Sequence, residues 1–408
     1  MSSLNQKFWW SGSVVLVVAA CGLAQAEFLD LKPLIAKVRA VGPKGAGHRE
    51  ATVAWQALVK ADAAQLPEIL AGLDDSGPLA ENWLRAAVEA VAERHVKNGG
   101  SLPMASLEKF LADSRHSPRG RRLAYELIAG VDQTAEPRLI PGLLNDPSLE
   151  LRRDAVALAL KQAEASAIPP ADKSTTVAAY RKAFHAARDL DQVKIAVEKL
   201  RGLGETVDVQ SHFGFVTRWK VAAPFDNGGA KGFDVAYPPE KEVDLKDFCD
   251  GKGGKIIGWV DVATTDDYGN VDLNKSYDTY QRDADGKPLP KKIEPQYKGS
   301  VAYAFAEIIA DKEQDVELRL GSTNANKIWL NGELLTANHI YHTGREVDQY
   351  VGRGRMKKGR NQILLKIAQN EQAEEWAQDW QFQLRVCDRI GTAILSQDRP
   401  SAQTAAAN

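Results

Sequence analysis

The side chains whose spacing suits metal binding are few in this chain of 408 residues. His339 and His342 form a His-x-x-His pair beside Tyr341, and two imidazoles are half of a zinc ligand set. Within a strand this spacing places the two rings on opposite faces unless a turn intervenes. Because no third or fourth ligand can be named from the sequence, we predict no metal site at this pair.

An oxygen-rich stretch, DDYGNVDLN from Asp266 to Asn274, offers a second set of candidate ligands. Carboxylate and amide oxygens of the kind found at Asp266, Asn270 and Asp272 are what calcium prefers. The order of these residues does not match an EF-hand, and Asp and Asn also stabilise turns by bonding to nearby backbone. We favour a solvated turn, with calcium as the alternative and no other cofactor expected.

Three common catalytic signatures are absent from the sequence: Gly-x-Ser-x-Gly, Gly-x-x-x-x-Gly-Lys-Ser/Thr and His-Glu-x-x-His. A glycosidase needs two carboxylates that face each other across a cleft. Glu333, Asp348 and Asp379 are available, but no pattern pairs them. We therefore predict that the chain is not an enzyme and has no catalytic residue.

Loop residues are the better candidates for ligand binding. Trp376 lies in the polar segment NEQAEEWAQDW, where no packing period is seen, and exposed indoles stack on sugar rings. Arg345 and Asp348 lie on the long connection from Thr336 to Tyr350, and such loops commonly bind ligands. We predict Trp376, Arg345 and Asp348 as ligand-binding residues. The alternatives are a Trp that caps the edge of a sheet and an Arg–Asp surface ion pair.

The elements that position these residues belong to an ordinary globular protein, with 44% hydrophobic and 26% charged residues. The length is sufficient for two domains with cores of their own. A net charge of −2 removes the usual electrostatic argument for nucleic acid and for an anionic membrane surface. We expect a glycan or a protein as the partner, and no membrane span.

The first 26 residues have the composition of a signal peptide. Lys7 precedes an apolar run from Val14 to Ala20 that is too short to span a bilayer. Ala24-Gln25-Ala26 is an A-x-A site, whereas Val18-Ala19-Ala20-Cys21 resembles a bacterial lipoprotein box. We expect a periplasmic or secreted protein, with a lipid anchor at Cys21 as the alternative. In an oxidising compartment Cys249 and Cys387 form either a disulfide or two separate thiols.

Residues 27–205 show the 3.6-residue period of helices and an internal repeat. Short apolar segments begin at Leu66, Leu107 and Ile140, and each precedes a longer helix with the order Arg, any residue, Ala and a bulky apolar residue. The longer helices carry this order from Arg85, Arg122 and Arg153. The pattern, clearest in PRLIPGLLNDPSLELRRDAVALALKQA, resembles HEAT-type repeats and implies an α-solenoid that offers an interaction surface. A generic helical bundle is the alternative.

Residues 206–395 change to short alternating segments separated by Gly, Pro, Asn and Asp, which predicts an antiparallel β-sandwich. The combination of VELRLGSTNANKIWLNGELL, KKGRNQILLKIAQ and WQFQLRV resembles galactose-binding-like jelly-roll domains, such as the sugar-binding module of family 2 glycoside hydrolases. The resemblance implies a fold that serves sugar binding, protein contact or spacing. Residues 396–408 are predicted to be a disordered tail.

Asn331-Gly332 lies between two apolar segments, and this pair is a strong hairpin signal because a type I′ turn needs positive φ at both positions. We interpret it as a marker of the fold. The chain is predicted to be an exported binding or scaffold protein that recognises its partner through sandwich loops and the helical-repeat surface. The alternative is a hydrolase or an accessory subunit of a polysaccharide-degrading system. Neither the ligand nor the oligomeric state follows from these residues.

Overall fold

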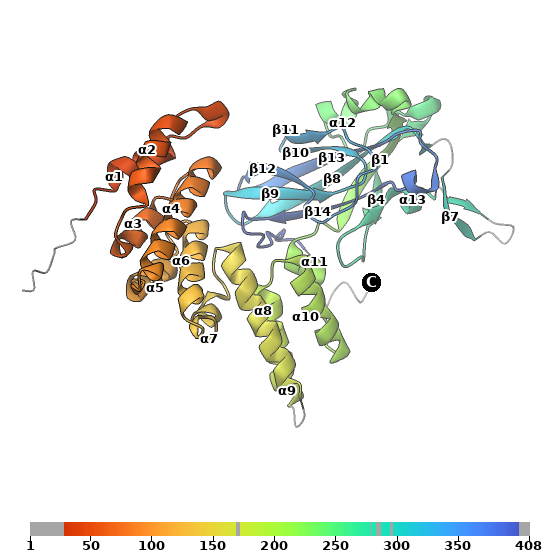
Figure 1. Cartoon of the computed structure of the whole chain (residues 1–408). Coiled ribbons are helices and arrows are strands. Elements are labelled where there is room, and N and C mark those ends of the chain that lie inside the picture. Colours follow the sequence, from red (N-terminus) through yellow and green to blue (C-terminus); the bar gives the residue numbers. More distant parts are fainter. Residues whose placement is uncertain (1–27, 169–171, 279, 283–286, 294–296, 400–408) are drawn as a thin grey trace, which may run out of the picture. The chain divides into compact units, whose positions relative to one another are not determined.

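The chain is a mixed α and β protein, with helices in its N-terminal part and antiparallel sheets in its C-terminal part (Figure 1). The computed structural model describes residues 28–168, 172–278, 280–282, 287–293 and 297–399. The predicted signal peptide, Cys21 and residues 400–408 of the predicted tail lie outside this part. Within it, no helix combines the length and the apolar character that crossing a membrane requires.

The chain divides into two compact units between Asp132 and Gln133. The first unit contains helices in pairs, in which a short helix usually precedes a longer one. Their bounds are α1 (Lys32–Arg39), α2 (His48–Leu58), α3 (Leu66–Ala71), α4 (Pro78–Lys97), α5 (Met104–Ala112) and α6 (Pro118–Val131). Proline begins α4 and α6, where its missing N–H costs nothing.

The second unit begins with helices and continues into the sheets. The helices are α7 (Ala135–Leu139), α8 (Leu149–Ser166), α9 (Lys173–Ala186), α10 (Leu190–Gly202) and α11 (Val209–Phe213). Ser148 and Asp172 cap the N-termini of α8 and α9 through their side-chain oxygens. The sequence prediction ended the helical domain at residue 205, whereas α7 to α11 share a compact unit with the sheets.

The repeated Arg-x-Ala motif falls on α4, α6 and α8. In each helix both the Ala and the apolar residue after it are buried: Ala87 and Val88, Ala124 and Tyr125, Ala155 and Val156. Two of these helices share a further feature: a buried arginine in each donates to a backbone carbonyl of the segment that precedes its own helix, in the last turn of α5 for Arg121 and in the connection before α8 for Arg152. Arg121 Nε donates to Leu111 O at 2.7 Å, and Arg152 Nε donates to Asp146 O at 2.8 Å.

Antiparallel strands form two principal sheets in the second unit. The six-stranded sheet has the order β11 (Glu333–Asn338), β10 (Ala325–Leu330), β13 (Gly359–Gln369), β8 (Ser300–Ala310), β1 (Arg218–Asp226) and β4 (Val260–Ala263). The four-stranded sheet has the order β12 (Tyr350–Met356), β9 (Gln314–Gly321), β14 (Gln381–Cys387) and β5 (Val271–Asp272). Smaller elements are β2 (Cys249–Asp250) with β3 (Ile256–Ile257), β6 (Tyr280–Arg282) with β7 (Pro288–Ile293), α12 (Pro238–Lys241) and α13 (Leu273–Ser276).

One hydrophobic core takes alternate side chains from both sheets. It contains Ile363, Leu365 and Ile367 from β13, together with Phe382, Leu384 and Val386 from β14. The intervening residues of the six-stranded sheet, such as Tyr303 and Leu364, belong to a second core on its other face. Both faces of the six-stranded sheet are therefore covered, which explains why its central strands are apolar almost throughout.

The Asn331-Gly332 prediction is confirmed. Both residues have positive φ, at 52° and 84°, and Leu330 pairs with Glu333 across the two-residue turn between β10 and β11. The Asn331 side chain also accepts a hydrogen bond from the backbone N–H of Gln362 at 2.9 Å. Asn331 thus joins the hairpin to β13 and has a structural role.

Strand β12 was missed by the sequence prediction, which treated its start as the end of a loop. Its inner positions are Tyr350, Gly352, Gly354 and Met356, and the two central ones have no side chain, so the apolar alternation by which strands are recognised is interrupted. Side chains from the neighbouring sheet fill the space instead, since a Cβ on either glycine would lie about 3 Å from Leu335 or Leu330. The apolar side chains of this contact therefore belong to the β10–β11 hairpin and not to β12.

Candidate functional site

Trp376 lies on the connection between β13 and β14 and is 62% exposed. Its ring meets His342 at a centroid distance of 5.0 Å and an interplanar angle of 82°. The neighbouring Trp380 is fully buried and donates its indole N–H to Ile367 O at 3.3 Å. The two tryptophans of this segment therefore have different roles, and only Trp376 presents its ring to solvent.

The surroundings of Trp376 hold it in place. His342 has a φ of 58°, donates its backbone N–H to Thr323 O at 2.8 Å, and places Nε2 2.9 Å from Asn370 Oδ1. Beneath the loop, Lys298 Nζ donates to Ala377 O at 3.0 Å. Burial lowers the pKa of Lys298 to about 8. The indole is thus supported by a fixed loop, which reduces the entropy lost when a ligand binds.

Asp348 lies in a charged cluster beside β9 and β14. Its carboxylate accepts a hydrogen bond from Arg385 Nε at 2.5 Å and one from Arg319 Nη1 at 2.8 Å. Arg319 also contacts Glu317 at 2.7 Å. Burial opposes the charged form of Asp348, but the hydrogen bonds from the two guanidinium groups outweigh it and hold the pKa of that carboxyl below its ordinary value. The cluster gives Asp348 a structural role.

Arg345 takes a different position. Its Nη1 donates to Asn270 Oδ1 at 2.9 Å and to Gln381 Oε1 at 2.5 Å. It makes no ion pair with Asp348 among the described residues, so the surface pair considered from the sequence is not formed. In the part of the chain that the structure describes, no hydrogen bond, ion pair or ring contact joins Trp376, Arg345 and Asp348 to one another.

Arg345 lines a small pocket in the second unit, which we call the α10 pocket. The pocket holds about 180 Å³ and is lined by residues of α10, the β4–β5 connection, the β11–β12 connection and β14. These residues are Leu190, Lys194, Asp266, Tyr268, Asn270, Arg345, Glu346, Val347 and Gln383. Sequence reasoning identified Arg345 as a binding residue but gave no signal for Lys194 or Gln383, which are distant in the sequence.

The calcium candidates form turn and cap contacts. Asp266 Oδ1 accepts the backbone N–H groups of Tyr268 and Asn270 at 2.9 and 3.1 Å. Asp272 accepts from the N–H of Lys275 and caps α13. Within the described ranges no group of three or more His, Cys, Asp or Glu side chains is arranged to hold a metal ion.

The His-x-x-His pair is also divided between two environments. The ring of His339 stacks on Phe233 with a centroid distance of 4.1 Å, whereas His342 contacts Asn370 and Trp376. Each imidazole has an aromatic neighbour of its own. The pair therefore serves the packing of the β11–β12 connection.

Cys249 and Cys387 are free thiols, which is the second of the two alternatives that the sequence left open. Cys249 on β2 packs against the core on the outer face of the six-stranded sheet. Cys387 alternates with the core residues of β14 and thus lies on the outer face of the other sheet. A disulfide needs Cα atoms within about 7 Å, which these positions do not allow. Burial raises the pKa of Cys387 to about 11, so its thiol stays protonated.

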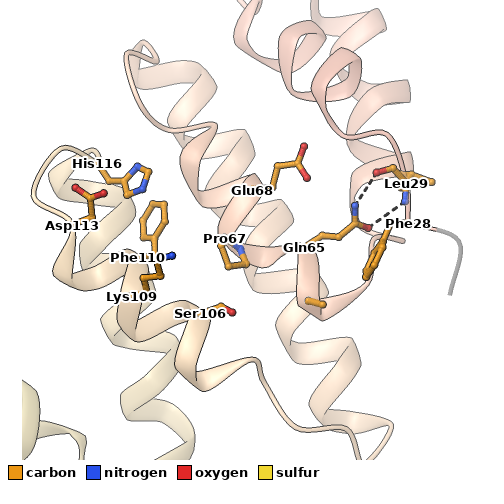
Figure 2. Close-up of a pocket in the computed structure, with 11 residues that line it drawn as sticks. Phe28, Leu29, Gln65, Pro67, Glu68, Ser106, Lys109, Phe110, Asp113 and His116 are labelled. Atoms are coloured by element: carbon orange, nitrogen blue, oxygen red, sulfur yellow. Dashed lines mark hydrogen bonds between the residues drawn. The ribbon is translucent and has the colours of Figure 1, made fainter. Parts of the chain in front are cut away.

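The first unit contains a larger pocket between α3 and α5, of about 680 Å³, which we call the α3–α5 pocket. Figure 2 shows Phe28 and Leu29 on one side, Phe110 and His116 on the other, and Glu68 between them. Phe28 is 63% exposed. The sequence analysis did not identify this pocket, because its residues come from separate helices and from the segment before α1.

Two contacts shape the α3–α5 pocket. The side-chain amide of Gln65 forms two hydrogen bonds with the backbone of Leu29 (Figure 2). It accepts one from the Leu29 N–H at 3.3 Å and donates one to the Leu29 C=O at 2.8 Å. His116 stacks on Phe110 at 3.9 Å and places Nδ1 2.8 Å from Asp74 Oδ2. The pocket therefore has an aromatic wall formed by Phe110 and His116 and an edge formed by the backbone of Leu29.

No family model and no curated protein matches the chain. Among similar solved structures is a β-glucosidase from Kluyveromyces marxianus in complex with glucose, with 13% identity and a TM-score of 0.23, over 41% of this chain and 16% of that one. An anti-sigma factor domain-containing protein from Clostridium clariflavum has 10% identity and a TM-score of 0.24, over 46% and 48%. A family 35 carbohydrate-binding module from Clostridium thermocellum has 13% identity and a TM-score of 0.16, over 22% and 71%.

The chain thus spans less than half the length of the first two structures. These neighbours include a glycoside hydrolase and a carbohydrate-binding module. At such TM-scores the likeness carries no argument about what this chain binds. The functional case therefore depends on the sites themselves.

Proposed function

We propose that the chain is an exported, non-enzymatic binding protein that recognises a glycan through the loop carrying Trp376. In this proposal the helices form a HEAT-type α-solenoid and the two sheets form a galactose-binding-like jelly-roll sandwich. The buried Ala positions of α4, α6 and α8 support the solenoid. The core shared by the two sheets supports the sandwich.

The observation that carries the proposal is the exposed ring of Trp376 on a supported loop. Indoles are usually buried, and one that stays 62% exposed on a loop held by His342 and Lys298 leaves a flat apolar surface for a sugar ring. Stacking that covers about 100 Å² at about 25 cal/mol/Å² contributes about 2.5 kcal/mol, which corresponds to about sixtyfold in Kd.

The engagement of carboxylates in structural contacts supports a binding role over a hydrolytic one. Asp348 is bonded to two arginines, and Glu317 contacts Arg319 and Arg353. Asp272 caps a helix. A glycosidase needs two carboxylates free to act on a glycosidic bond, and these three have other partners.

Titration with a panel of glycans, followed by tryptophan fluorescence and calorimetry, tests the proposal. Trp376→Ala is expected to weaken binding by about tenfold or more with no change in the unfolding midpoint, because the side chain is exposed. Phe248→Ala is the matched control, since Phe248 is 70% exposed in the same unit. A broad panel without any ligand, or equal binding by the Trp376→Ala variant, would refute the proposal.

A second function, the capture of a protein segment, is favoured by the α3–α5 pocket. Its volume and its exposed Phe28 suit an extended peptide with one large apolar side chain. Together the two sites match an accessory subunit that joins a glycan to a partner protein. Peptide-display selection with the wild type and with Phe28→Ser tests this function, and selected peptides that bind both proteins equally would contradict it.

A further inference from the structure

The α10 pocket contains two cations that have no anionic partner. Arg345 Nη1 is held by the neutral amide oxygens of Asn270 and Gln381, and Lys194 Nζ lies 5.7 Å from the centre of the Tyr268 ring. Among the residues that the structure describes, no carboxylate lies within ion-pair distance of either cation. A guanidinium oriented by neutral groups is suited to a carboxylate supplied by a ligand.

The same pocket also presents an amide that is open to hydrogen bonding. Gln383 is 5% exposed and lines the pocket, and its side chain forms no hydrogen bond with the described residues. The amide atoms of Gln383 are not among the fully buried atoms that lack a partner, so they remain accessible from the pocket. A polar ligand in the pocket would satisfy this amide.

Two carboxylates line the pocket beside the cations. Asp266 already accepts two backbone N–H groups through Oδ1, and Glu346 is exposed on the β11–β12 connection. Carboxylates accept hydrogen bonds from hydroxyl groups. A simple anion would use only the two cations, and a neutral sugar would use only the hydrogen-bonding groups. A ligand with a carboxylate and several hydroxyl groups meets both requirements.

We infer that the α10 pocket binds an acidic sugar residue, a uronic acid, with its carboxylate on Arg345 and Lys194. The volume of about 180 Å³ equals the space of about six water molecules, which suits one sugar ring. Tyr268 provides a ring against which the sugar packs, and Gln383, Asp266 and Glu346 bond its hydroxyl groups. This inference rests on the proposed glycan binding and names the class of sugar.

Calorimetric titration of the full chain with glucuronate, glucose and acetate tests the inference. Glucuronate is expected to bind at least tenfold more tightly than glucose or acetate, since each lacks one half of the recognised chemistry. Arg345→Gln is expected to weaken glucuronate binding by about tenfold or more. Arg218→Gln is the matched control, because Arg218 is an exposed arginine of the same unit outside the pocket.

The outcomes separate this inference from the proposed function. Glucuronate binding that is lost in Arg345→Gln but kept in Trp376→Ala supports the pocket as a separate subsite. Equal binding of glucose overturns the role of the carboxylate, and equal binding of acetate overturns the role of the sugar. If a glycan binds through Trp376 while millimolar glucuronate shows no saturable binding, the inference fails and the proposed function stands.

Discussion

The substitution Asp348→Asn tests whether Asp348 stabilises the fold or binds a ligand. Asn removes the charge and keeps the shape, and it tolerates the φ of 65° at this position. The change leaves Arg385, which is 2% exposed, and Arg319 without the carboxylate between them. Breaking a buried ion pair by removing one partner costs about 3–5 kcal/mol. Because the Asp348 side chain is 27% exposed, we expect the lower end, about 3 kcal/mol.

Urea unfolding of both proteins measures this loss. Trp219 and Trp380 are buried in the unit that contains Asp348, so tryptophan fluorescence reports its transition. Asp315→Asn is the matched control, since Asp315 pairs with Arg355 at 2.7 Å but its side chain is 71% exposed. An exposed pair is worth less than about 1 kcal/mol.

The pH dependence provides an independent check. The folded pKa of Asp348 lies below its ordinary value, so the carboxylate stabilises the fold above the unfolded pKa of about 3.9. This contribution is lost as the pH falls through the lower, folded pKa. The difference between wild type and Asp348→Asn should therefore narrow as the pH decreases below about 4. A loss no larger than that of Asp315→Asn at pH 7 would refute the structural role.

Three further predictions concern stability. Lys298→Met should remove a rise in unfolding free energy of about 3 kcal/mol between pH 8 and about 10.4, because burial lowers the folded pKa of Lys298 to about 8 and the unfolded state then binds more protons. Parallel urea titrations of both proteins across this pH range measure the rise. Gly214→Ala should cost about 2 kcal/mol or more in thermal or urea unfolding, since φ is 78° and the added Cβ would lie 2.4 Å from Val386 O. Ala87→Leu should cost about 1–3 kcal/mol through overpacking, whereas Leu at the exposed neighbour Ala86 should change the same urea midpoint little.

Much of the fold could be predicted from local patterns. The helical period, the recurring buried Ala positions and the Asn331-Gly332 turn are properties of short segments, and each appears in the structure at the predicted place. Strand β12 was missed because its two glycines interrupt the alternation of apolar residues. The space beside them is filled by side chains of β10 and β11. Local sequence does not encode such a contact.

The candidate sites were less predictable. Trp376 was singled out as a ligand-binding residue because the polar segment around it carries no packing period; its side chain is exposed, and its binding role stays a prediction. Asp348 and Arg345 are three residues apart in the sequence, yet one joins a buried arginine cluster and the other lines the α10 pocket. The free thiols of Cys249 and Cys387 are a further example, since the presence of two cysteines in a sequence does not tell how far apart they lie in the fold.

The sequence by itself determined that a helical part precedes a part built of strands and where the Asn331-Gly332 turn lies, because hydrophobic period and turn residues act within a few positions of the chain. Only the tertiary structure decided which polar side chains share a pocket. The α10 pocket is lined by Lys194, Arg345 and Gln383, although the first and last of these are 189 positions apart in the sequence. Their proximity results from the packing of α10 beside the sheets, and whether a charge is satisfied or free depends on neighbours that the packing alone supplies.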